Sequence, residues 1–216
     1  MGQSKFRIAA YLLLLCGEAS LAQDVARPSL VVGDGWAYER TDRTKKVSEG
    51  VREVKVVAKS ETEYRFELRN PQTGNSVRGA ADMNMNPVEL NNERRVAPFR
   101  PDYAWPLSVG KKWVGTFSHV NAAGTGQFKE ERSCEVAGKE SLQTKAGMFE
   151  ALKIVCQGKF SSPDNRGQTT LHGYTEAVYW YAPAVRRNVR IEYKDGTYNF
   201  GVWNNTLDEL VSILPK

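Results

Sequence analysis

Strict alternation of apolar and charged residues is the feature that most limits what this chain can fold into. In Tyr64–Arg69 and again in Val189–Lys194, every apolar side chain is followed by a charged one. Successive side chains of a β-strand point to opposite faces, so this pattern predicts strands with one buried and one solvent-facing side. No long stretch has the apolar stripe of an amphipathic helix. The two segments therefore favour an all-β fold.

Less regular alternation of the same kind marks much of the remaining chain. Turn signals such as Pro71-Gln72-Thr73-Gly74 and Lys194-Asp195-Gly196 separate these segments. The further predicted strands are Trp36–Arg40, Val51–Lys59, Trp113–His119, Gln127–Ala137, Phe149–Phe160, Thr169–Tyr181 and Tyr198–Trp203. Leu207–Leu214 is predicted to be a last strand rather than a short closing helix. About nine strands at short spacing predict an antiparallel sheet that curls into an open barrel, half-barrel or sandwich.

A short internal similarity suggests that the sheet consists of two related half-sheets. Val32-Gly33-Asp34-Gly35-Trp36 and Val109-Gly110-Lys111-Lys112-Trp113 place Val-Gly and Trp at the same spacing, each before a predicted strand. A chance match of a five-residue pattern is the alternative. Between the halves, residues 80–106 are rich in Asn, Arg and Pro. We predict a long connection there, which either crosses the open end of the sheet or forms a functional lid.

The first residues have the composition of a secretion signal. Lys5 and Arg7 precede the apolar run Ile8–Cys16, and small residues at Ser20 and Ala22 define a cleavage position after residue 22. The run is about half the ~20 residues that a membrane-spanning helix needs. We therefore expect residues 1–22 to be a cleaved signal peptide, residues 23–216 to form a single β domain without a transmembrane segment, and the protein to be periplasmic or extracellular.

Two cysteines remain after this cleavage, Cys134 and Cys156. Paired cysteines in an oxidising compartment usually form disulfides. Cys134 shares a predicted strand face with Val136, Cys156 shares one with Ile154, and a chain reversal within Gly138–Gly147 would make the two strands antiparallel. We predict a Cys134–Cys156 disulfide, because a zinc site or a catalytic thiol would need partners that the sequence does not place nearby.

Few residues of this chain suggest catalysis. His119 and His172 lie on different predicted strands, without an acidic or nucleophilic neighbour at a characteristic spacing. The sequence has no nucleophile elbow, phosphate loop, paired-histidine metal motif or dinucleotide fingerprint. The net charge of +5 comes from charges of mixed sign rather than from a basic stripe, which disfavours nucleic acid as a partner. We therefore predict no catalytic, metal-binding or cofactor-binding residue, and a hydrolase is the least favoured class.

One segment combines aromatic and basic residues and is the best binding candidate. Tyr179-Trp180-Tyr181-Ala182-Pro183 is followed closely by Arg186 and Arg187. Such a combination can bind an anionic headgroup or stack on bases. The alternative is that the aromatic residues fill the core and the arginines face solvent on the next strand. The candidate binding residues are Tyr179, Tyr181, Arg186 and Arg187.

Four motifs in the second half of the chain resemble those of a known family. They are Pro106–Trp113, Thr144–Ile154, Tyr179–Pro183 and Glu209–Ser212. These motifs are similar to those of the TapB-like group of bacterial exported proteins, whose function is unknown. The resemblance implies a curled β-sheet related to open barrels and a cell-envelope setting, and it supplies no catalytic residue.

The leading functional hypothesis is a non-enzymatic envelope protein whose curled sheet binds a lipid-like or other amphiphilic ligand, or an envelope protein, on its concave face. A secreted, aromatic-rich β scaffold without a catalytic constellation motivates it. The alternative is a structural or adhesive module that assembles at the cell surface.

Overall fold

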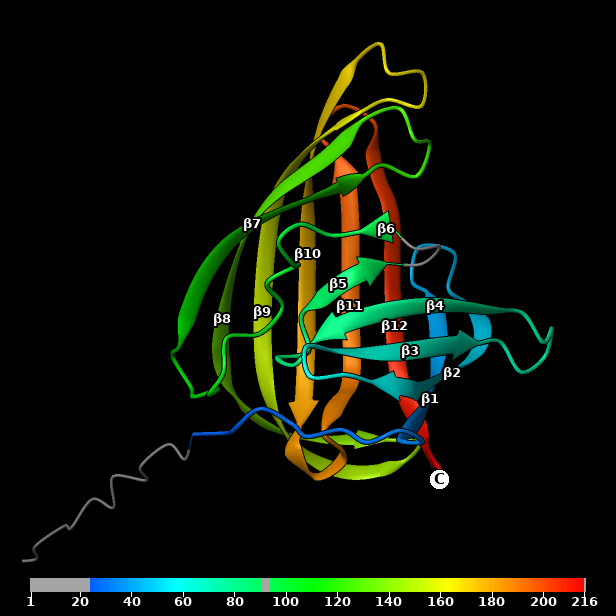
Figure 1. Ribbon diagram of the computed structural model, residues 1–216, viewed down its shortest axis with the longest axis vertical. Coiled ribbons are helices and arrows are strands. Elements are labelled where there is room, and N and C mark those ends of the chain that lie inside the picture. Colours follow the sequence, from blue (N-terminus) through cyan, green and yellow to red (C-terminus); the bar gives the residue numbers. More distant parts are fainter. Residues whose placement is uncertain (1–23, 91–93, 216) are drawn as a thin grey trace, which may run out of the picture.

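A single antiparallel sheet makes up the protein and curls into a nearly closed barrel (Figure 1). The computed structural model describes residues 24–90 and 94–215, so the expected signal peptide lies outside the described residues. The strands are β1 (Gly35–Asp42), β2 (Val47–Lys59), β3 (Glu63–Arg69), β4 (Ser76–Asp82), β5 (Pro87–Leu90), β6 (Arg94–Arg95), β7 (Lys112–Val120), β8 (Gln127–Thr144), β9 (Gly147–Pro163), β10 (Thr170–Ala182), β11 (Arg187–Thr197) and β12 (Gly201–Leu214). One 3₁₀ turn, η1 (Pro183–Val185), joins β10 to β11. No helix within the described ranges is long and apolar enough to cross a membrane. The predicted all-β curled sheet is confirmed.

The sheet consists of two six-stranded meanders. Its strand order is β6-β5-β4-β3-β2-β1-β12-β11-β10-β9-β8-β7, so that within β1–β6 and within β7–β12 every strand pairs with its neighbours in sequence. The halves join where β1 pairs with β12 along its whole length. At the other seam, between β6 and β7, Ala97 and Ser118 form an isolated bridge with hydrogen bonds of 2.8 and 2.9 Å.

The two halves begin with the same turn, at the Val-Gly motifs found in the sequence. Gly33 donates its N–H to the Val56 carbonyl at 2.9 Å, and Gly110 donates to the Val136 carbonyl at 2.8 Å. Both glycines have positive φ, 97° and 86°, a conformation that side chains disfavour. Leu30 and Leu107, each three residues before its glycine, are completely buried. The spacing match therefore corresponds to one local structure used twice.

The predicted connection over residues 80–106 is shorter than expected, because β4 ends inside it and β5 and β6 follow. β4 was missed because Gly79, Ala80 and Ala81 lack the branched or aromatic side chains typical of strands. Their small size has a packing reason, since Gly79 pairs with Phe66 and Ala81 pairs with Tyr64 on β3. The connection between the halves therefore begins only after β6 and ends at β7.

The end of β11 also differs from expectation. Tyr198–Trp203 is not a separate strand, because β11 ends at Thr197 and the chain turns over the next three residues before β12 begins at Gly201. Lys194-Asp195-Gly196 is not a turn but part of β11, with a register shift between Asp195 and Gly196. A Cβ atom at Gly196 would lie 2.4 Å from the carbonyl oxygen of Gly201, so glycine permits the close pairing that follows the shift.

Cys134 and Cys156 occupy directly paired positions of β8 and β9 and form a disulfide, with 4.1 Å between their Cα atoms. The reversal lies within the predicted Gly138–Gly147 region, and both strands are longer than predicted, because β8 continues to Thr144 and β9 starts at Gly147. This far part of the hairpin packs across neighbouring strands. Glu140 accepts a hydrogen bond from Trp180 Nε1 at 2.7 Å, and Lys145 pairs with Glu39 of β1.

Loss of this disulfide should destabilise the barrel. The bond closes a loop of 22 residues, for which chain entropy predicts a contribution of about 3 kcal/mol. The double variant Cys134→Ser/Cys156→Ser should therefore lose about 3 kcal/mol in urea unfolding. Added reductant should destabilise the wild type and leave the double variant unchanged. Equal unfolding free energies for the two oxidised proteins would contradict the expectation.

Candidate ligand-binding cavity

All four binding candidates from the sequence line one cavity of about 200 Å³ inside the barrel. Tyr179 and Tyr181 point inward from β10, while Trp180 between them faces the β8–β9 hairpin. The chain then turns at η1, and Arg186 adopts a left-handed conformation with φ of 56°. This turn brings Arg186 and Arg187 to the same cavity as the two tyrosines, rather than leaving both arginines in solvent.

The opposite wall comes from residues that the sequence did not single out. The first half-sheet contributes Tyr38 of β1, and the connection between the halves contributes Asp102 and Tyr103. Tyr103 stacks on Trp105 at 5.4 Å and lies 6.2 Å from the ring of Tyr179. The other lining residues are Arg40, Arg52, Val54, Leu68, Met85, Pro87, Arg100, Asn188, Ile191 and Asp208. The cavity therefore combines a tyrosine wall with several arginines.

The arginines that line the cavity differ in whether a carboxylate neutralises their charge. Arg40 pairs with Asp208 through two contacts of 2.6 Å, and Arg186 pairs with Asp34 at 2.9 Å. Arg187 forms no ion pair with any carboxylate in residues 24–90 and 94–215.

Aromatic rings hold this guanidinium instead. It lies 5.0 Å from the centroid of Trp36 and 4.8 Å from that of Phe66. Cation–π contacts orient the group without neutralising its charge. Arg187 is therefore a cation of the cavity whose charge no carboxylate of the described chain neutralises, although its side chain also hydrogen-bonds with Tyr38.

Asn188 adds an unsatisfied polar atom. Its side chain is buried, and its Oδ1 has no hydrogen-bond partner among the described residues. Its backbone carbonyl accepts a hydrogen bond from the Tyr38 hydroxyl at 2.7 Å. Buried polar atoms are nearly always paired, so this lone acceptor beside Arg187 points to a site for a ligand donor.

A buried ionic network borders the cavity. Arg132 of β8 contacts Asp102 through Nη1 and Glu130 through Nε, both at 2.7 Å. Asp102 also pairs with Arg100 at 2.7 Å, so the network has two positive and two negative charges. Thr175 donates to Glu130 at 2.8 Å across β9. A Cβ atom at Gly158 of β9 would lie 2.2 Å from Glu130 Oε1, so the polar bridge fills the place of a missing side chain.

Burial keeps the tyrosine hydroxyls of the cavity protonated. It raises the pKa of Tyr38 to about 12, against the opposing charge of Arg187. It likewise raises the pKa of Tyr179 and that of Tyr181 to about 12. These hydroxyls are neutral near pH 7, so Tyr38 donates its proton to the Asn188 carbonyl, while Tyr179 and Tyr181 can donate to another acceptor.

Neither histidine is placed for acid-base work with a carboxylate of the described chain. The His119 ring stacks on Phe128 at 4.7 Å, its Nδ1 lies 2.8 Å from the Val120 carbonyl oxygen, and burial lowers its pKa. His172 is exposed on β10. No ion pair between a histidine and a carboxylate forms in residues 24–90 and 94–215.

Three solved structures align with this chain over most of its length. A "putative lipoprotein" from Parabacteroides distasonis ATCC 8503 aligns with a TM-score of 0.55 and 17% identity, over 89% of this chain and 100% of that chain. A "putative exported protein with YmcC-like fold" from Bacteroides fragilis NCTC 9343 aligns with a TM-score of 0.49 and 14% identity, over 89% and 100% of the chains. The "hypothetical lipoprotein YmcC" from Escherichia coli (K12) gives 0.43 and 11%, over 87% of each chain.

The similarity to the Parabacteroides protein shows a shared fold and does not extend to function. No family model matches the chain, and no curated protein matches it. The TapB-like resemblance is therefore not supported by a family match.

The raised tyrosine pKa values predict a loss of stability in alkali. The folded chain keeps the Tyr38 proton up to about pH 12, whereas an unfolded tyrosine releases it near pH 10. Stability is therefore intact below pH 10 and falls as the pH rises from 10 towards 12. We expect the free energy of urea unfolding to fall less steeply over this range in Tyr38→Phe than in the wild type.

Two comparisons make this measurement specific. At pH 8, Tyr38→Phe should already be less stable by about 1 kcal/mol, because the hydrogen bond to Asn188 is lost. Tyr198→Phe removes the hydroxyl of an exposed tyrosine and should keep the wild-type stability at pH 8. Parallel curves for the wild type and Tyr38→Phe would show that Tyr38 does not titrate as argued.

Proposed function

We propose that this protein is an exported cell-envelope binding protein that holds a small amphiphilic ligand by its anionic end in the barrel cavity. The observation that carries the proposal is the guanidinium of Arg187, which is held by two aromatic rings and lacks a carboxylate partner in the described chain. A carboxylate or phosphate group of a ligand would neutralise it through charge-assisted hydrogen bonds. The hydroxyls of Tyr103 and Tyr181 can donate further hydrogen bonds to that group, and the free Oδ1 of Asn188 can accept one from a ligand hydroxyl.

The size of the cavity limits what can enter. About 200 Å³ is less than the ~300–1,000 Å³ of most small-molecule sites. Aromatic side chains and the ionic network fill much of the remaining interior. The enclosed part of the ligand is therefore an anionic group with a few carbon atoms, and a longer apolar chain would extend out of the cavity.

Three observations support the proposed export. The first 22 residues have the pattern of a signal peptide. The Cys134–Cys156 bond suits an oxidising compartment. The proteins of similar fold are described as lipoproteins or exported proteins. We propose a periplasmic or extracellular location, and the four second-half motifs make the TapB-like group the proposed affiliation.

Binding of a short anionic amphiphile tests the proposal. Octyl phosphate should bind the purified protein in isothermal titration calorimetry, and octyl glucoside, with the same chain and no charge, should bind much more weakly. Arg187→Gln should weaken octyl phosphate binding by about 10- to 100-fold, since a hydrogen bond to a charged group contributes roughly 1.5–3 kcal/mol.

Arg69→Gln is the matched control, because Arg69 is an exposed arginine of β3 outside the cavity. It should bind octyl phosphate as the wild type does. Equal affinity of Arg187→Gln and the wild type, or equal binding of the charged and uncharged amphiphiles, would refute the proposed site.

A further inference from the structure

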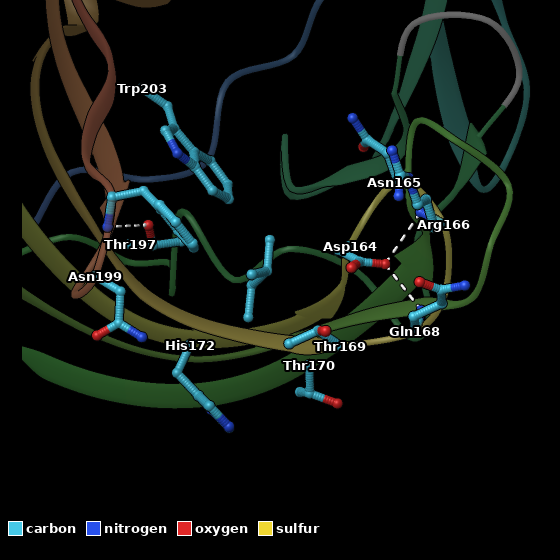
Figure 2. A pocket seen from close by; sticks show the side chains of 12 residues that line it. Asp164, Asn165, Arg166, Gln168, Thr169, Thr170, His172, Thr197, Asn199 and Trp203 are labelled. Atoms are coloured by element: carbon cyan, nitrogen blue, oxygen red, sulfur yellow. Dashed lines mark hydrogen bonds between the residues drawn. The ribbon is translucent and has the colours of Figure 1, made fainter.

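A second concave site lies at one end of the barrel, outside the cavity described above. It is a groove of about 760 Å³ between the β9–β10 loop and the tip of the β11–β12 hairpin. Figure 2 shows Trp203 on one side of this groove and Asn165 and Arg166 on the loop at the other side. Its volume falls within the ~300–1,000 Å³ typical of ligand sites. The hairpin tip lies at the end of the barrel away from the C-terminus (Figure 1).

Both walls of the groove are held in place by local contacts. Asp164 accepts hydrogen bonds from the backbone N–H groups of Arg166 at 3.0 Å and Gln168 at 2.9 Å, which fixes the loop (Figure 2). On the other wall, Thr197 Oγ1 accepts from the backbone N–H of Phe200 at 3.1 Å. The walls are therefore shaped before any ligand arrives.

The aromatic wall presents ring surface that the fold does not cover. Trp203 is 47% exposed and Phe200 is 72% exposed, although large apolar side chains are usually buried. The ring of Trp203 lies 5.8 Å from that of Phe160, because Gly173 of β10 leaves room there. A Cβ atom at Gly173 would lie 2.3 Å from the Phe160 ring. Packing thus fixes the tryptophan while part of its surface stays open to the groove.

The remaining lining is rich in neutral hydrogen-bonding groups. The side-chain amides of Asn165, Gln168 and Asn199 form no hydrogen bond with the rest of the described chain. Arg166 is the lining cation and Asp164 the lining anion, and the loop already engages the latter. A lipid chain or an apolar peptide would leave the amides without hydrogen-bond partners. A strongly charged ligand would not find enough side chains of opposite charge in the groove.

We propose that this groove binds a neutral oligosaccharide. The polar C–H groups of a sugar ring suit the negative face of an indole ring, and its hydroxyls suit amides that both donate and accept. Trp203 supplies the stacking surface, and Asn165, Gln168 and Asn199 supply the hydrogen bonds. The site is separate from the Arg187 cavity and does not depend on it.

Two-dimensional NMR of the tryptophan indole N–H groups tests this proposal on the intact protein. The probes are maltotriose and chitotriose, each added to about 10 mM because sugar sites of this kind bind weakly. One of the trisaccharides should shift the indole signal of Trp203, assigned by its loss in Trp203→Phe, and leave the signal of the buried Trp36 in place.

Variants locate the site. Asn199→Ala removes an exposed amide and should weaken binding at least 3-fold without loss of folding. Tyr198→Ala is the matched control, since Tyr198 is exposed on the same tip but does not line the groove. Arg187→Gln should leave the Trp203 shift unchanged.

Three results would overturn the proposal. The first is that neither trisaccharide shifts the Trp203 signal. The second is that Asn199→Ala binds as the wild type does. The third is that phosphatidylcholine vesicles, rather than sugars, shift the indole signal of Trp203 and that Tyr198→Ala abolishes this shift, which would make the tip a membrane-docking surface.

Discussion

The interior of this barrel depends on one buried arginine. The guanidinium of Arg132 is almost fully enclosed and contacts Glu130 on its own strand and Asp102 on the connection between the halves. Removing one partner of such a group leaves an uncompensated buried charge, at a cost of several kcal/mol. The ion pair therefore fixes the connection to the second half-sheet. Tyr103, the next residue, is thereby placed against Tyr179 and forms a wall of the cavity.

Glycines on the strands let the interior fill without large side chains at every position. The Glu130–Thr175 hydrogen bond passes over Gly158, and the Phe160 ring passes over Gly173. In both places a side chain from a neighbouring strand occupies the space that a Cβ atom would need. As a result the barrel has a mixed polar and aromatic interior, and the cavity beside Arg187 is small.

The alternation of apolar and polar residues correctly predicted features that are set within one strand or between two strands that follow each other in sequence. It identified the paired cysteines, because alternate residues of β8 and β9 face each other, and it grouped Tyr179 with Tyr181 on one face. It missed β4, because the small residues of this strand pair with aromatic residues of β3 and do not form an alternating apolar pattern. Tyr38 and Asp102 also escaped it, because the β1–β12 pairing and the connection bring them to the cavity from far away in sequence. No linear pattern contains such long-range contacts.

The repeated turns at Gly33 and Gly110 have a consequence for assembly. Each half is a six-stranded meander with two edges, and a single half would leave both edges unpaired. Pairing of β1 with β12 covers one edge of each half, and the Ala97–Ser118 bridge draws the other two together. The two half-sheets therefore associate within one polypeptide. The linker makes their association intramolecular, so closure of the barrel does not depend on protein concentration.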